Sequence, residues 1–229
     1  LAAALGGRGR VLIWDTRDGR LLMDDQGFSG PARMVAFDVN GRLAATSADG
    51  RIRVWDAEGR KIAERAPLAE GRPWTLAFSP DGALIAVGYE NALRVEVLAT
   101  ADLRTVLVPD LAGLVGEGLP AVAWASDGRG GLQLYGAGYA RVGGPPAPPV
   151  PGGRRGIDRR AIVTDQAPAG QPAAETPASD PGREYVIRRW ADFGFGPHRD
   201  VPAARDAIVH LLPVPGGGLV YAAADPGWG

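Results

Sequence analysis

The run RIRVWD at residues 51–56 repeats the run RVLIWD at residues 10–15. The two tryptophans, Trp14 and Trp55, stand 41 positions apart (55 − 14). A second series keeps this spacing: Val-Ala-Phe at 35–37 precedes Asn-Gly, and Leu-Ala-Phe at 76–78 precedes Asp-Gly. A fixed period of this length is typical of chains built from one repeated supersecondary unit.

Each repeat has the pattern of a small antiparallel sheet. Short runs rich in Val, Ile, Leu and Ala alternate with Asn-Gly, Asp-Gly or Glu-Gly turns, which is typical of consecutive hairpins, and no helical period persists. In the clearest two units we expect strands at 33–38, 43–47, 51–56 and 60–65, and at 74–79, 83–89, 92–98 and 103–108. A sheet of this size cannot cover both of its faces alone, so the units must stack radially as the blades of a propeller.

We therefore expect an all-β, incomplete propeller of four-stranded antiparallel blades, about three full and two partial. The expected units are a partial blade at 1–24, full blades at 32–65, 73–108 and 119–202, and a partial blade at 207–224. Residues 141–184 interrupt the third blade with nine Pro, seven Gly and no aromatic residue. Such a composition predicts a flexible insertion between strands b and c, in which only Ala161 to Val163 could form a strand. Because the chain opens on Leu1, we also expect it to be a segment of a longer polypeptide.

The markers of these units resemble the WD-repeat β-propeller family. The resemblance rests on the Trp-Asp pairs, on the turn Ser-Ala-Asp-Gly at 47–50 and on the turn Phe-Ser-Pro-Asp-Gly at 78–82. It implies that Asp49 joins the Ser47 hydroxyl and the Trp55 indole in a hydrogen-bond network, with Glu90 or Asn91 in the place of Asp49 one blade later. The family's usual Gly-His pair before strand a is missing. The structural repeat residues are Trp14, Asp15, Ser47, Asp49, Trp55, Asp56, Asp81 and Trp190.

Charge and composition argue against several classes of ligand. The 25 basic and 26 acidic residues leave a net charge of -1, so we expect no nucleic-acid partner. The chain has no cysteine and only two histidines, His198 and His210, without an acidic cluster at ligand spacing, so we expect no metal and no cofactor. No run approaches the roughly 18 to 20 apolar residues of a membrane span. The absence of cysteine also fits a reducing, cytoplasmic compartment.

Motifs for catalysis are missing as well. The glycines at 113, 116 and 118 lack the Lys-Ser/Thr and the strand-to-helix context of a phosphate-binding loop. The histidines lie near no Gly-x-Ser-x-Gly run, so a serine nucleophile has no visible base. Arg154, Arg155, Arg159 and Arg160 form one basic cluster inside the insertion, which we interpret as a solvated charge run, with contacts to phosphates or to an acidic protein as the alternative. We therefore expect no catalytic residue in this chain.

The remaining candidate is the rim where strands a begin and b–c turns meet, because propellers bind partners with the loops of one rim. The candidate rim residues there are Arg33, Trp74, Tyr89 and Glu90, although Trp74 could equally pack between blades. We expect a scaffold for a protein partner, within a larger multidomain protein. The runs at 188–192 and 202–206 weakly resemble the WD-repeat arms of bacterial caspase-like peptidases, which implies a ligand-sensing regulatory arm of an enzyme as the alternative. A propeller that catalyses at its own channel is the third possibility.

Overall fold

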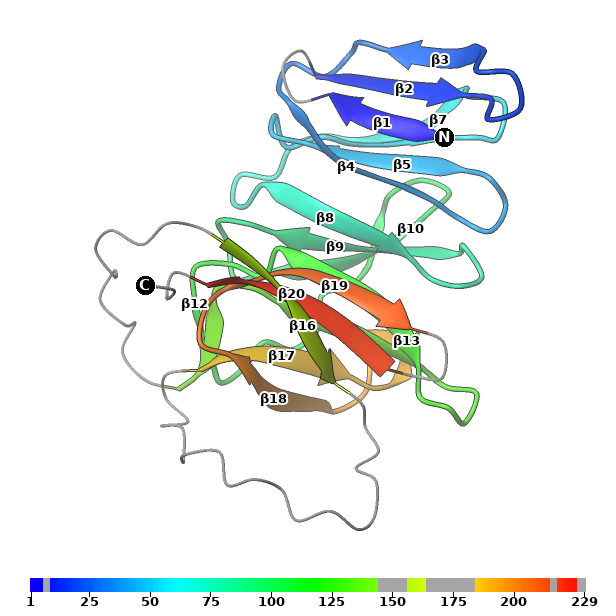
Figure 1. Cartoon of the computed structure of the whole chain (residues 1–229). Helices are drawn as coiled ribbons and strands as arrows, with labels where there is room; N and C mark the ends of the chain where they lie inside the picture. Colours follow the sequence, from blue (N-terminus) through cyan, green and yellow to red (C-terminus); the bar gives the residue numbers. More distant parts are fainter. Residues whose placement is uncertain (6–8, 144–155, 164–183, 215–217, 226–229) are drawn as a thin grey trace.

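The computed structural model describes residues 1–5, 9–143, 156–163, 184–214 and 218–225. In this part of the chain all regular structure is β except one 3-10 turn, η1 (Asp192–Gly194). Figure 1 shows the first sheets stacked from the N-terminal strands at the top downward, with the red C-terminal strands in the lower half of the molecule. The first and last sheets lie at opposite ends of the stack, so the described blades form an unclosed propeller, as the fold-class prediction expects.

Three sheets have four antiparallel strands, which we name a to d from the inner to the outer strand. Blade I contains β4 (Ala32–Phe37), β5 (Leu43–Ser47), β6 (Ile52–Trp55) and β7 (Lys61–Arg65). Blade II contains β8 (Pro73–Phe78), β9 (Leu84–Tyr89), β10 (Val95–Ala99) and β11 (Thr105–Leu107). Blade III contains β13 (Ala121–Ser126), β14 (Leu132–Ala137), β17 (Tyr185–Trp190) and β18 (His198–Ala204).

Smaller sheets flank these blades. The N-terminal partial blade consists of β1 (Ala2–Leu5), β2 (Arg10–Trp14) and β3 (Leu21–Asp25). The C-terminal partial blade consists of β19 (Ile208–Val214) and β20 (Gly218–Asp225), to which β16 (Gly156–Val163) adds a third strand. A two-stranded ribbon joins β12 (Leu114–Gly116) to β15 (Ala140–Val142).

Only residues 141–143, 156–163 and 184 of the insertion are described. Residues 144–155 and 164–183 lie outside the described residues, so flexibility there stays a prediction. The described remainder differs from a plain loop, because β15 runs into the insertion and β16 pairs with β20 from Gly156 onward. β16 contains the run Ala161 to Val163, where the sequence allows a strand, and begins five residues earlier. β-branched residues of this kind favour pairing with a free sheet edge.

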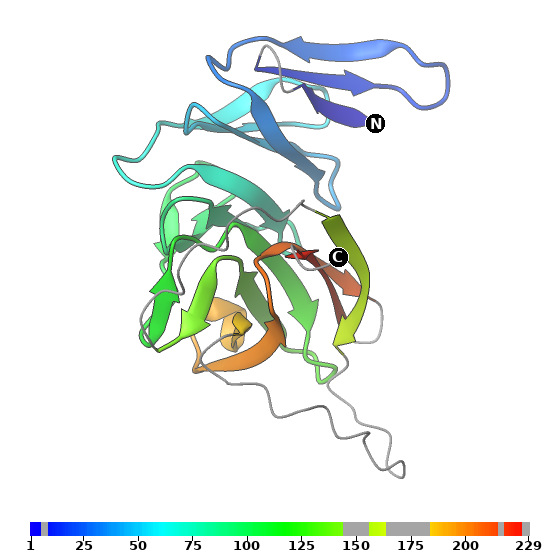
Figure 2. The same ribbon diagram turned by 60° about the vertical axis from the view of Figure 1, so that its left-hand side comes forward.

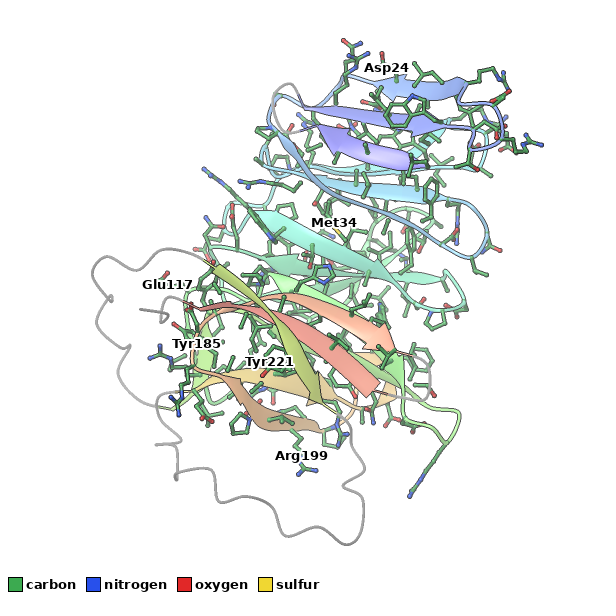
Figure 3. All side chains as sticks on the ribbon, viewed as in Figure 1. Asp24, Met34, Glu117, Tyr185, Arg199 and Tyr221 are labelled. Carbon is green, nitrogen blue, oxygen red and sulfur yellow. The ribbon has the colours of Figure 1, made fainter. Side chains whose placement is uncertain are left out.

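Four apolar layers hold the stack together, one between each pair of neighbouring sheets. Because successive side chains of a strand point to opposite faces, Ile52 and Val54 pack against blade II, while Trp55 of the same strand packs against the N-terminal partial blade. Met34, labelled in Figure 3, belongs to the layer between blades I and II. Both faces of a blade are therefore buried, which explains why the strands are apolar at successive positions instead of alternating.

Strand c of each full blade interrupts this apolar pattern with one buried charge at an equivalent position: Arg53, Glu96 and Arg188, each at most 5% exposed. Arg53 Nη1 lies 2.6 Å from Asp25 Oδ1 in the preceding sheet, and Arg65 Nη2 of blade I lies 3.1 Å from Glu96 Oε2 in blade II. These two ion pairs connect successive blades with opposite polarity. Buried charges are tolerated only when such partners satisfy them.

The buried charge of Arg188 is satisfied within its own blade and by backbone. Its guanidinium binds both oxygens of Asp200 in its own blade, at 2.6 and 2.7 Å. Its remaining nitrogen, Nη1, donates to the carbonyl of Ala112, at 2.8 Å, on the connection that arrives from blade II. The contact to the preceding blade is therefore made through backbone instead of a side-chain charge.

The carboxylate of Glu64, at the outer edge of blade I, should make the free energy of unfolding depend on pH. Its carboxylate accepts hydrogen bonds from Lys61, Arg51 and Arg53, at 2.7, 2.6 and 3.0 Å. The Lys61 hydrogen bond, helped by Arg53 and Arg51 and opposed by burial, lowers the pKa of Glu64 to about 2. The unfolded-state pKa is about 4.3, so this contribution to stability is complete above that value and is lost as the pH falls toward 2.

We therefore expect the free energy of unfolding of the wild-type chain to fall more steeply than that of Glu64→Gln between pH 5 and pH 2.5, in urea titrations at both pH values. Glu70→Gln is the control, because Glu70 is exposed and has no ion pair among the described residues. A difference between wild type and Glu64→Gln that stays constant over this pH range would contradict the assignment.

Candidate interaction site on the strand a rim

Two successive blades begin strand a with a large side chain at the same position. Arg33 is the second residue of β4, and Trp74 is the second residue of β8. Glu90 follows the last residue of β9, where strand b of blade II ends. Strand a starts and strand b ends at the same rim of a propeller, because the two strands are antiparallel neighbours. The topology therefore brings these three residues to one rim.

Arg33, Trp74 and Glu90 form a single contact cluster, which we call the rim cluster. The Arg33 guanidinium carbon lies 4.1 Å from the centroid of the Trp74 ring, a cation–π arrangement. Arg33 Nη2 lies 3.5 Å from Glu90 Oε1, at the long limit of a hydrogen bond, and the two side chains are 29% and 25% exposed. The ring thus holds the guanidinium in place while most of its donors stay available.

Hydrogen bonds to backbone carbonyls hold in place the strands that carry the rim cluster. The Thr46 hydroxyl of blade I donates to the Trp74 carbonyl at 2.8 Å, which joins the two blades at this rim. The Glu90 amide donates to the Arg72 carbonyl at 3.1 Å, so Arg72 lies next to the cluster. The Arg72 side chain is exposed, and within the described part of the chain it has no acidic partner. The rim cluster together with Arg72 therefore contains two arginines and one glutamate, and Glu70 on the same connection is exposed.

Tyr89 is not a rim residue, so this part of the sequence prediction is wrong. Its side chain is 1% exposed and belongs to the apolar layer between blades I and II. Its hydroxyl donates to Glu96 Oε2 at 2.5 Å. Burial, followed by the charge and hydrogen bond of Glu96, raises the pKa of the Tyr89 hydroxyl well above its ordinary value. At the end of β9 the side chain points to the face of the neighbouring blade, whereas the next residue, Glu90, points to the rim.

The structure also corrects the network that the resemblance implies for blade I. The Trp55 indole donates to Asp25 Oδ2, at 3.2 Å, and not to Asp49. The Ser47 hydroxyl donates to the carbonyls of Gly30 and Pro31, at 3.0 and 3.2 Å. Asp49 instead accepts from the amide of Ser29, at 2.8 Å. Ser47 and Asp49 are still in contact, because the Ser47 hydroxyl accepts from the Asp49 amide at 3.3 Å, so only the partner of Trp55 differs from the implied network. The further bonds of Ser47 and Asp49 tie blade I to the connection that precedes it, and the Trp55 bond ties it to β3.

The turn aspartate has a counterpart in blade II. Asn91 Oδ1 accepts from the Arg72 amide at 2.7 Å, just as Asp49 accepts from the Ser29 amide. Burial of Asp49 is outweighed by the amide hydrogen bonds from Arg51 and Ser29, which lower the pKa of this carboxyl. Asn91, and not Glu90, therefore takes the place of the turn aspartate, which leaves Glu90 free to contact Arg33.

The other repeat residues act locally. Asp56 accepts from the amides of Glu58 and Arg60, at 3.1 and 2.8 Å, and Asp15 accepts from the amide of Arg17 at 2.9 Å, so both close c–d turns. Asp81 closes an a–b turn by accepting from Ser79 and Ala83. Trp190 is fully buried, and its indole donates to the Asp110 carbonyl at 2.7 Å, whereas Trp14 is half-buried.

Sequence reasoning missed the buried charges Arg53, Glu96 and Arg188. A signal was present, because each is a charged residue inside an otherwise apolar strand c run. Their partners Asp25 and Arg65 stand at the ends of strands β3 and β7, where a charge looks like ordinary solvent exposure. Among the residues with described positions, no group of three His, Asp or Glu side chains could hold a metal ion, and no helix is long and apolar enough to cross a membrane.

Comparisons with known proteins support the fold. A model of the family "WD domain, G-beta repeat" matches residues 25–56. The crystal structure of the WD40 beta propeller domain of Doa1 is similar to this chain with a TM-score of 0.63 at 10% identity, over 98% of this chain and 57% of that one. The chain thus has the WD40 propeller fold and spans little more than half the length of that domain. No curated protein matches the sequence. Neither match bears on the resemblance to arms of caspase-like peptidases, which stays a prediction.

Proposed function

We propose that this chain is a non-catalytic interaction module whose rim cluster, extended by Arg72, binds a protein partner. WD40 propellers generally serve as protein-interaction scaffolds, and a rigid stack of blades presents its rim loops in one fixed arrangement. The observation that carries the proposal is the Arg33 guanidinium held against the partly exposed Trp74 ring at 4.1 Å. Arginine and tryptophan are the side chains most often found as energetic hot spots of protein interfaces.

The chemistry of the cluster favours binding over catalysis. An arginine stays protonated at any ordinary pH, and a tryptophan indole offers one donor and no base. Glu90 already faces the Arg33 guanidinium, with its Oε1 3.5 Å from Arg33 Nη2. These residues can orient and recognise a partner, but they supply no nucleophile.

The charge balance of the rim indicates what the partner presents. Arg33 has one long contact to Glu90, and Arg72 has no acidic partner among the described residues. A carboxylate from a partner could bind both guanidiniums with charge-assisted hydrogen bonds, which are about twice as strong as neutral ones. We therefore expect an acidic side chain, next to an apolar one that packs on Trp74, in the partner's contact surface.

The proposal predicts that the double variant Arg33→Ala/Trp74→Ala loses its partner. Each hot spot contributes about 2 kcal/mol, which corresponds to about a 30-fold change in Kd. Partners are first identified by cross-linking and mass spectrometry with the intact chain, and their affinities are then measured by calorimetry. The matched control is Arg20→Ala/Phe195→Ala, which removes the same kinds of side chain from exposed c–d turns.

Thermal unfolding of both variants checks that the fold is intact, because all four side chains are at least partly exposed. The same partners bound with the same affinity by the rim variant and by the control variant would contradict the choice of site.

A further inference from the structure

The chain contains two asparagines, Asn40 and Asn91, and the structure restrains their side chains differently. Asn40 stands in the a–b turn of blade I, between β4 and β5, and is exposed. Among the described residues its side-chain amide makes one hydrogen bond, from Nδ2 to Asp38 Oδ2 at 3.5 Å, the long limit for such a bond. Asn91 Oδ1, in contrast, accepts from the Arg72 amide at 2.7 Å. The Asn40 side chain is therefore the less restrained of the two.

The residue that follows each asparagine differs as well. Gly41 follows Asn40 and adopts a positive φ of 79°. Because glycine has no Cβ, a reacting group can approach its amide nitrogen closely. The Gly41 amide donates to the Asp38 carbonyl at 3.2 Å, the upper end of the range for such hydrogen bonds. Ala92, which follows Asn91, has a Cβ that packs against the layer between blades I and II. The nitrogen next to Asn40 is therefore the more accessible one.

We propose that Asn40 is a site of spontaneous deamidation, in which the Gly41 amide nitrogen attacks the side-chain carbonyl carbon, Cγ, of Asn40. The new N–Cγ bond closes a succinimide ring and the Cγ–Nδ2 bond breaks, so the side-chain NH2 group leaves with the Gly41 amide proton as ammonia. Water then opens the ring at either carbonyl, which yields aspartate or isoaspartate. The net reaction consumes one water, releases one ammonia and needs no other reactant. The a–b turns lie on the rim opposite the rim cluster, so this site is independent of it.

The turn that contains Asn40 also connects blades I and II. Strand a of blade I, β4, lies beside strand a of blade II, β8, in both ribbon views (Figures 1 and 2). Arg42 Nε donates to Asp38 Oδ2 at 2.7 Å, and Arg42 Nη2 donates to the Gly82 carbonyl of blade II at 2.6 Å. A Cβ atom at Gly82 would lie 2.5 Å from Asp38 Oδ2 and 3.1 Å from Asn40 Nδ2. The two a–b turns are therefore in close contact.

Both products of the reaction weaken this contact. Aspartate replaces the Asn40 donor by a second carboxylate next to that of Asp38, whose side chain is fully buried, and like charges at this separation repel each other. Isoaspartate adds a methylene group to the backbone between Asp38 and Arg42. The Asp38 amide donates to the Arg42 carbonyl at 2.9 Å, and the Arg42 amide donates to Asp38 Oδ1 at 2.8 Å, so a longer backbone disrupts the closure of the turn. Deamidation thus loosens blade I from blade II at this rim.

Incubation of the intact chain at mildly alkaline pH, followed by mass spectrometry of tryptic peptides, measures the conversion. Cleavage after Arg33 and Arg42 gives a peptide of residues 34–42, which contains Asn40 alone. We expect Asn40 to convert at least about tenfold faster than Asn91, because only Asn40 is followed by glycine. Isoaspartate in the product distinguishes ring opening from direct hydrolysis, which gives aspartate alone. An unchanged Asn40, or a product without isoaspartate, overturns the proposal.

The variant Ala92→Gly separates the effect of the structure from that of the sequence, because it gives both asparagines a following glycine. We expect Asn91 of this variant to convert at least about threefold more slowly than Asn40, since its hydrogen bond to the Arg72 amide must first break. Thermal unfolding checks that the variant is folded. Equal rates at the two positions overturn the assignment of the difference to the structure.

The effect on the blades is measured by thermal unfolding before and after the incubation. We expect the deamidated wild-type chain to unfold at a midpoint about 2 to 4 °C lower than the fresh chain. Asn40→Gln is the matched control, because it keeps the amide but its longer side chain closes a less favourable ring. Its midpoint should stay constant over the same incubation. A midpoint that does not change although Asn40 has been converted overturns the inferred loosening of blade I from blade II.

Discussion

Replacing Glu96 by alanine is expected to lower the free energy of unfolding by about 3 to 5 kcal/mol, the range for breaking a buried ion pair from one side. The Glu96 side chain is fully buried, and Arg65, Arg94 and the Tyr89 hydroxyl all converge on its two oxygens. Removing the carboxylate leaves the Arg65 guanidinium, which is only 16% exposed, without its anion between two blades. Urea denaturation followed by tryptophan fluorescence measures the loss.

The matched control for this change is Glu58→Ala. Glu58 also pairs with an arginine, Arg60, but its side chain is 65% exposed and that of Arg60 is 75% exposed. An exposed pair contributes about 0 to 1 kcal/mol, so the control should change stability little. If Glu96→Ala costs no more than Glu58→Ala, the buried ion pair does not hold blades I and II together.

Trp55→Ala is expected to destabilise the chain by about 3 to 5 kcal/mol, because a large aromatic side chain leaves a cavity between blades. Trp55 is 1% exposed, its ring packs edge-on against Phe28, and its indole donates to Asp25. The equivalent tryptophan of the preceding repeat, Trp14, is half-buried. Trp14→Ala should therefore cost markedly less, although both residues belong to the same Trp-Asp motif.

Thermal unfolding of the two tryptophan variants under identical conditions shows whether the loss of stability follows the Trp-Asp motif or the burial of the tryptophan. Equal losses of stability would mean that the motif itself, and not the apolar layer around Trp55, determines the contribution of this residue.

The repeat pattern carried most of the fold. A strand needs only local alternation and a turn, so the run at 43–47 is observed as β5 with the expected bounds. The d strand expected at 103–108 is shorter, β11 (Thr105–Leu107), because Leu103 adopts a positive φ of 57° that ends the extended backbone. Hydrophobic alternation and turn residues therefore predict where strands lie, whereas the backbone conformation of single residues determines where they begin and end.

The candidate site was predicted in part. Arg33, Trp74 and Glu90 were expected at the rim, and the structure brings them into contact through two blades and one b–c turn. Tyr89 was misplaced because its position at the end of strand b left open whether the side chain points to the rim or into the layer between blades I and II, where it lies. Asn91 and Glu90 were indistinguishable as substitutes for the turn aspartate until the Arg72 amide was found to bind Asn91.

The period, the order of strands within each blade and the stacking of blades are predictable from the residues alone, because they follow from local hydrophobic patterning and turn chemistry. The folded stack was needed to reveal that Arg53 meets Asp25, that Arg65 meets Glu96, and that β16 pairs with β20. Such contacts join residues of different blades, and their partners depend on which faces and edges the stack brings together. No pattern within a single repeat contains that information.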